Sequence, residues 1–206
     1  MSDARVDFGN ITVFSNLNAV FPANALSVVV GPSGSGKSTL LSAMSGYSRL
    51  TAGRIRLGDR KEYLPDPRQV AWVPQGSNAL AARSALANVM IGALSAGMTI
   101  ADAEDRARVE LGRVGLGDRI LTPARLLSGG ELQRVGFARA LAASRPIIFA
   151  DEPSASLDLA ATRRLRGVLF DLRSSTTIII ATHDQELVAA AENIVDLRKP
   201  GGPYVA

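Results

Sequence analysis

The chain has 206 residues and a formal net charge of +4, and 47% of its residues are hydrophobic while 20% are charged. This length and composition indicate a globular protein with a substantial core, and the absence of cysteine excludes disulfides and thiolate-rich zinc sites. Of the 23 basic residues 20 are arginines spread along the chain, and no basic run is dense enough to favour nucleic acid as a partner.

Membrane-spanning and secreted segments are also not expected. No stretch approaches the roughly 18 to 20 apolar residues that a membrane span needs, and the first residues, MSDARVDF, form no apolar secretion segment. We therefore expect a cytoplasmic protein.

Four short apolar runs rich in β-branched residues predict buried strands, because their apolarity is continuous rather than alternating. They are LSVVV at 26–30, VAWV at 70–73, PIIFA at 146–150 and TTIIIAT at 176–182. Helical patterns are found at 37–47, 131–143 and 158–173. This alternation favours an α/β fold whose mainly parallel sheet is covered by helices.

The segment 79–127 has a different character. It is rich in alanine and predicts helices at 84–95 and 101–114, with Gly115 and Gly117 after them and no convincing strand. We interpret it as a helical subdomain inserted into a single domain that covers 1–206.

The stretch GPSGSGKST fits the pattern GxxxxGK[ST] and lies between a predicted strand and a predicted helix, where a phosphate-binding loop belongs. Its residues are Gly31, Pro32, Ser33, Gly34, Ser35, Gly36, Lys37, Ser38 and Thr39. Glycines let backbone N–H groups point inward, the helix start adds partial positive charge, and Lys37 neutralises the β- and γ-phosphates. Ser38 can offer its hydroxyl to Mg²⁺. We predict a nucleoside triphosphate site.

Two adjacent carboxylates, Asp151 and Glu152, end the predicted strand in PIIFADEP. Neighbouring side chains of a strand point to opposite faces, so the two can have different tasks. We predict that Asp151 binds Mg²⁺, directly or through water, and that Glu152 orients or deprotonates the attacking water.

The stretch LLSGGELQRV contains Ser128 and Glu131 at the spacing of a capping box, which opens a helix. A cap does not need Gly129 and Gly130. These glycines leave backbone N–H groups uncovered at a positive helix end, which indicates a second anion site.

SGGELQR, with Gln133 and Arg134 after the glycines, resembles the signature of the ATP-binding cassette (ABC) ATPases. The order of the motifs agrees with that family: the phosphate loop, VPQ at 73–75, LSGGE at 127–131, FADEP at 149–153, SASLD at 154–158 and THD at 182–184. The resemblance covers nearly the whole chain, and it implies a P-loop NTPase fold with an N-terminal antiparallel β portion.

The resemblance implies roles for further residues. Gln75 is similar to the residue that contacts Mg²⁺ and the attacking water. Ser128, Gly129, Gly130 and Glu131 belong to the signature that reaches the γ-phosphate of a partner's ATP. Asp158 resembles the aspartate at the dimer interface, and Phe8 the aromatic residue that stacks on adenine, although core packing is an alternative for Phe8.

His183 resembles the histidine that senses the γ-phosphate, and its position supports this independently. It is the only histidine in the chain and directly follows the apolar run 176–182. Open α/β sheets bind ligands at the polar ends of such strands.

The family implies two copies closed head to tail around two ATP and Mg²⁺, as a homodimer or a pair with a related ATPase subunit. Hydrolysis would drive a separate membrane permease, and the chain would lie peripherally on the inner face of the cell membrane through that permease. LTPARL before the signature favours the short ATPases that resemble the lipoprotein-release and cell-division type. Two alternatives are a non-transport ABC ATPase acting on DNA or ribosomes, and a small-molecule kinase.

Overall fold

The computed structural model describes residues 1–56, 66–76 and 78–198. Its larger sheet has five parallel strands in the order β5-β6-β7-β3-β8. These strands are β3 (Leu26–Val30), β5 (Val70–Val73), β6 (Ile147–Asp151), β7 (Thr177–Ala181) and β8 (Asn193–Asp196). The four strands that we predicted are confirmed within one or two residues at their ends, and β8 is an addition.

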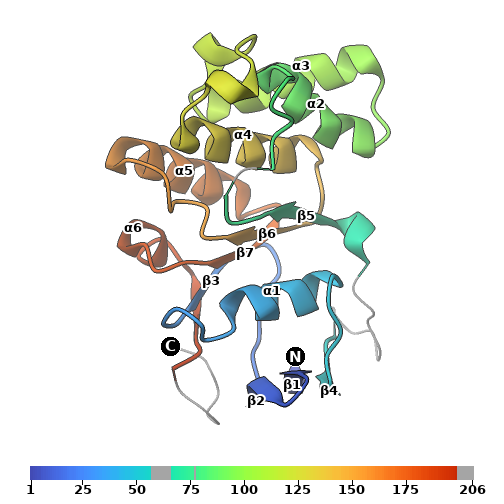
Figure 1. Ribbon diagram of the computed structural model, residues 1–206, viewed down its shortest axis with the longest axis vertical. Helices are drawn as coiled ribbons and strands as arrows, with labels where there is room; N and C mark the ends of the chain where they lie inside the picture. Colours follow the sequence, from blue (N-terminus) through green and yellow to red (C-terminus); the bar gives the residue numbers. More distant parts are fainter. Residues whose placement is uncertain (57–65, 77, 199–206) are drawn as a thin grey trace.

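A smaller antiparallel sheet is formed by the N-terminal part of the chain. It contains β1 (Ser2–Phe8), β2 (Ile11–Leu17) and β4 (Ala52–Arg54), in the order β2-β1-β4. It lies beneath the larger sheet in Figure 1. The expected P-loop NTPase fold with a mainly parallel sheet and an N-terminal antiparallel portion is confirmed.

Helices cover both faces of the larger sheet (Figure 1). Helix α1 (Lys37–Ser45) packs on one face, where Leu40 and Leu41 are fully buried with Phe149 and Ile179. Helices α4 (Gly129–Ala142) and α5 (Leu159–Leu172) cover the other face. Because strand side chains alternate between the two faces, β6 and β7 contribute to both cores.

Helices α2 (Ala85–Ser95) and α3 (Ile100–Arg113) follow β5 and form the layer at the top of Figure 1, packed on α4. The remaining helical elements are the short α6 (Gln185–Val188) and the 3₁₀ turns η1 (Pro67–Gln69), η2 (Gly117–Arg119) and η3 (Ala124–Leu126). That 79–127 forms a subdomain within one domain stays a prediction.

Within the described ranges, none of the helices is on its own both long and apolar enough to cross a membrane. Among the helices that the structure describes, the pair α2 and α3 meets that criterion by length and composition when taken together, and the two are bent by 120° at their junction.

Candidate functional site

The phosphate loop runs from the end of β3 into α1. Gly36 is the residue before α1 and has a left-handed backbone with φ of 91°, which an L-residue with a side chain adopts only with strain. A Cβ on Gly36 would lie 2.6 Å from Cγ1 of Val13 in β2. The small sheet therefore packs directly against this turn, and glycine is needed there for both reasons.

Lys37 is held inside the loop. Its Nζ donates hydrogen bonds to the carbonyl oxygens of Gly31 (2.9 Å) and Pro32 (3.2 Å), and lies 3.9 Å from Oε1 of Glu152. Carbonyl groups and a carboxylate thus surround this ammonium group, and the loop curls around it. An anion of higher charge, such as a phosphate, would be a stronger partner for the same nitrogen.

Asp151 is buried at the end of β6. Burial raises the pKa of its carboxyl group, and the charge of Glu152 adds to this, while a hydrogen bond from Ser38 and the charge of Lys37 act in the opposite direction. Its Oδ1 atom has no hydrogen-bond partner among the described residues. A buried carboxylate oxygen without a partner, beside a serine hydroxyl, is a donor set that suits Mg²⁺.

Other candidate metal ligands are sparse. In the described part of the chain, no group of three or more His, Asp or Glu side chains gathers as in an all-protein metal site. Proteins commonly hold Mg²⁺ with one or two carboxylates together with water and substrate phosphates. The fit rests on Ser38 and Asp151.

Glu152 has a left-handed backbone with φ of 46°, which is uncommon for a residue other than glycine. Its N–H donates to the carbonyl of Ala181 at 2.8 Å, so the turn is fixed to the end of β7. Its carboxylate accepts a hydrogen bond from Oγ1 of Thr182 (3.2 Å) and lies 3.1 Å from Nδ1 of His183. The side chain is buried, and its carboxylate is oriented by Thr182 and His183.

His183 and Gln75, two of the predicted residues, are exposed. The His183 side chain is 79% exposed, although its Nδ1 touches Glu152. Gln75 follows β5 and is exposed. Gln75 therefore lies at the edge of the same sheet as Asp151, because β5 and β6 are neighbouring parallel strands.

Ser128 and Glu131 form the predicted capping box at the start of α4. The Ser128 hydroxyl accepts from the N–H of Glu131 (3.2 Å), and the Glu131 carboxylate accepts from the N–H of Ser128 (2.8 Å). This hydrogen bond to the Ser128 backbone lowers the pKa of Glu131, and Arg119 lies 3.3 Å from its carboxylate. Ser128 and Gly129 are exposed.

The loop between β6 and α5 supports this helix start. A Cβ on Gly130 would lie 2.6 Å from the carbonyl oxygen of Ser156, so the two backbones touch. Asp158 caps α5 by accepting a hydrogen bond from the N–H of Ala161 at 2.7 Å, and it is exposed. Asp158 therefore has a structural task within the chain besides the interface position that the resemblance implies.

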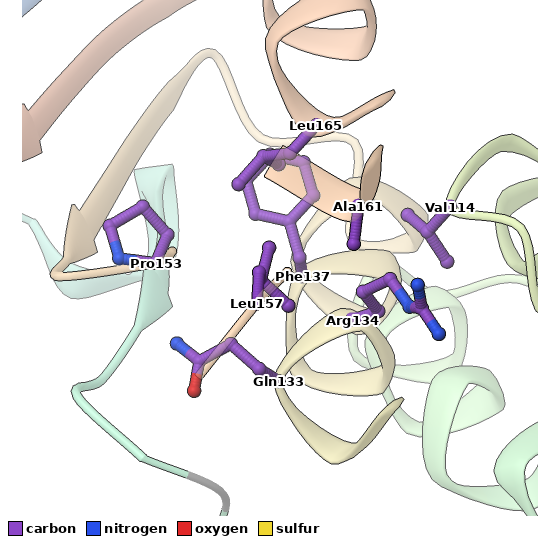
Figure 2. Close-up of a pocket in the computed structure, with 8 residues that line it drawn as sticks. All are labelled: Val114, Gln133, Arg134, Phe137, Pro153, Leu157, Ala161 and Leu165. Carbon is purple, nitrogen blue, oxygen red and sulfur yellow. The ribbon is translucent and has the colours of Figure 1, made fainter. Parts of the chain in front are cut away.

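Gln133 contacts the backbone of Glu152, and the sequence alone did not predict this contact. It lies on α4 with an exposed fraction of 3%, and its Nε2 donates to the main-chain oxygen of Glu152 at 3.5 Å. In Figure 2 its amide points toward Pro153, while Phe137, Leu157 and Leu165 fill the apolar side of the same small pocket. This pocket is mostly apolar and lies between α4 and α5, so it is not a second nucleotide site.

Phe8 ends β1 opposite Ile11 and is 58% exposed. Core packing was the alternative to adenine stacking, and this exposure disagrees with core packing. An aromatic ring open to solvent near the hairpin that touches Gly36 can offer its face to a base.

The predicted residues thus form two groups. Lys37, Ser38, Asp151, Glu152 and His183 lie together at the carboxyl ends of β3, β6 and β7. In the described ranges no hydrogen bond or ion pair joins Ser128, Gly129 or Gly130 to this group. The second anion site that we predicted therefore does not complete the first one within the contacts of a single chain.

A family model described as "ABC transporter" matches residues 14–155. Among curated proteins, the chain is 38% identical to the lipoprotein-releasing system ATP-binding protein LolD of Cereibacter sphaeroides, over 92% of this chain and 89% of that protein. It is 37% identical to the macrolide export ATP-binding/permease protein MacB of Hyphomonas neptunium, over 82% of this chain but only 28% of that longer protein.

Solved structures agree with these similarities. An ATP-binding cassette solved as a dimer in a post-hydrolysis state, bound to ADP and Pi, superposes with a TM-score of 0.85. It is 28% identical in sequence, and the match covers 97% of this chain and 94% of the other.

Proposed function

The chain belongs to the ABC transporter family as an ATPase subunit, and from that premise we propose that it powers a permease that is a separate polypeptide. Support comes from LolD, an ATP-binding protein of which this chain matches 89%. The name of MacB describes an ATP-binding/permease protein, and this chain matches 28% of the length of that protein. The alternative of an ATPase acting on DNA or ribosomes finds no support in these relatives.

We propose that ATP binds along 31–39 with its phosphates at the start of α1. Lys37 would exchange its contacts with the carbonyls of Gly31 and Pro32 for the β- and γ-phosphates. Pro32, Ser33, Gly34, Ser35 and Thr39 complete the cradle, and Phe8 would stack on the adenine ring. Ser38, Asp151 and Gln75 would hold Mg²⁺, which when bound neutralises part of the phosphate charge.

For hydrolysis, Glu152 is the residue we propose to orient or deprotonate the attacking water. Its carboxylate is fixed by Thr182 and lies against His183, which we propose to sense the γ-phosphate. Gln75 would place the water from the loop after β5. Lys37 and Glu152 are already 3.9 Å apart, so the proposed phosphate-binding and water-activating groups are neighbours.

The signature is proposed to act on the ATP of a second copy. The Ser128 oxygen accepts from the N–H of Glu131, and its hydroxyl proton would be donated to the γ-phosphate. Gly129, Gly130 and Glu131 belong to the same turn, and Asp158 lies in the loop that supports it. The similar solved cassettes that are dimeric support a head-to-tail homodimer, or a pair with a related ATPase subunit.

Location follows from the partner. We propose that the chain is cytoplasmic and associates peripherally with the inner face of the cell membrane through the permease, without nucleic acid. The segment of about 79–127 is proposed as the helical subdomain, inserted into the single ABC ATPase domain of 1–206, that contacts the permease.

The observation that carries the proposal is the convergence of Lys37, Asp151 and Glu152 at one sheet edge, with the signature outside it. We expect Glu152→Gln to bind ATP with only a residual turnover and to accumulate as a dimer in size-exclusion chromatography with ATP and Mg²⁺. The wild type with ADP serves as the control and should elute as a monomer. A Glu152→Gln protein that stays monomeric at saturating ATP contradicts the proposed dimer.

A further inference from the structure

Thr182 is a fully buried polar residue at the end of β7, with an exposed fraction of 0%. A hydroxyl group buried without hydrogen bonds is costly, so its partners show what the fold gains from it. The Thr182 hydroxyl has two partners. Its Oγ1 lies 3.2 Å from Oε2 of Glu152 and 3.1 Å from the backbone nitrogen of Asp184.

The direction of these two hydrogen bonds follows from chemistry. The backbone N–H of Asp184 can only donate, so the Thr182 oxygen accepts from it. The single hydroxyl proton is then available for the Glu152 carboxylate, which in its ionised form can only accept. Thr182 therefore donates to Oε2 of Glu152.

This donation distinguishes the two oxygens of Glu152. Oε2 accepts from Thr182, Oε1 lies 3.9 Å from Nζ of Lys37 in the phosphate loop, and Nδ1 of His183 lies 3.1 Å from both oxygens. The Thr182 backbone is itself fixed, because its N–H donates to the carbonyl of Val29 in β3 at 3.2 Å. The hydroxyl thus holds Glu152 relative to the strand that leads into the phosphate loop.

We infer that Thr182 is a positioning residue for ATP hydrolysis, which holds Oε2 of Glu152 so that Oε1 faces the nucleotide. This inference rests on the proposed role of Glu152. Thr182 does not touch the reacting atoms and acts through Glu152 and through the backbone of the turn that carries His183. It explains why a hydroxyl is buried at a place where the neighbouring strand residues are apolar.

The test compares Thr182→Val, which keeps the β-branched shape and removes the hydroxyl, with Thr182→Ser, which keeps the hydroxyl. We expect Thr182→Val to lower kcat by about 10- to 100-fold while KM for ATP changes by less than about twofold, because binding is made by other residues. Thr182→Ser should retain kcat within about threefold. The matched control is Thr162→Val, which removes the hydroxyl of a different buried threonine, one that lies in α5, and it should keep wild-type kcat.

A second measurement separates positioning from folding. In a Glu152→Gln background, Thr182→Val should change the residual turnover by less than about twofold, because the carboxylate that it positions is gone. A multiplicative loss in that background, or a Thr182→Val protein with wild-type kcat, overturns the inference while leaving the proposed function intact. A wild-type protein that binds ATP without hydrolysing it overturns both.

Discussion

At the scale of single residues, Asp151 is buried, and one of its carboxylate oxygens has no hydrogen-bond partner among the described residues. Burial raises its pKa, so the folded chain holds this proton more tightly than the unfolded chain does. The resulting contribution to stability is complete below the ordinary carboxyl pKa and is lost as the pH rises through the raised one. Above the raised pKa, the ionised Asp151 therefore weakens the fold.

We expect Asp151→Asn to raise the thermal midpoint of the nucleotide-free protein at neutral pH and to abolish Mg²⁺-dependent ATPase activity. For a chain of this size, an increase of 1 kcal/mol in the free energy of unfolding raises the thermal midpoint by about 2 to 4 °C. The advantage over the wild type should shrink as the pH falls toward 4, which differential scanning calorimetry across pH measures. An unchanged midpoint at pH 7.5 would contradict the destabilising role of this carboxylate.

At the scale of helices and strands, α2 and α4 approach each other at Gly92. A Cβ there would lie 2.1 Å from the carbonyl oxygen of Arg139, which is backbone and cannot rotate away. We expect Gly92→Ala to lower the free energy of unfolding by about 1 to 3 kcal/mol, since one of the helices must shift.

Gly167 in α5 provides the control, because a Cβ there meets nothing within 4 Å. Gly167→Ala should raise the free energy of unfolding by about 0.5 to 1 kcal/mol, because alanine has a higher helix propensity than glycine and meets no steric conflict here. Urea unfolding of both variants measures the contrast. If the two substitutions had equal effects, the tight packing of α2 on α4 would be disproved.

Helices and strands were predicted well from the sequence where the pattern of residues within one segment is enough to define the element. The apolar runs predicted β3, β5, β6 and β7, and the S-x-x-E spacing predicted the cap of α4. The contacts of Thr182 and Gln133 with Glu152 could not be predicted, because they join positions 30 and 19 residues apart that only the fold brings together. The place of β3 between β7 and β8 has no local signal either.

At the scale of the whole molecule, the question is whether a nucleotide is shared between two chains. We expect a mixture of Lys37→Met and Ser128→Asp proteins to recover ATPase activity that neither variant has alone. Aspartate still caps a helix, so Ser128→Asp keeps α4 folded while it removes the hydroxyl proton and repels phosphate. Half of the dimers should be hybrids with one intact site each, giving about a quarter of wild-type turnover.

The control for this mixture is the double variant with both changes in one chain. In a hybrid of the double variant with wild type, one site carries the Lys37 change and the other site carries the Ser128 change. Neither site is intact, so these hybrids should have no ATPase activity. No recovery in the mixture of single variants, with normal ATP binding by Ser128→Asp alone, would refute the shared site.

The contact of Gly130 with the Ser156 carbonyl has a consequence for any partner that meets this side of the molecule. The start of α4 and the loop that carries Asp158 already pack against one another within a single chain, before any partner binds. A partner therefore encounters a preassembled surface, and the entropy lost on association does not include the ordering of two separate loops against each other.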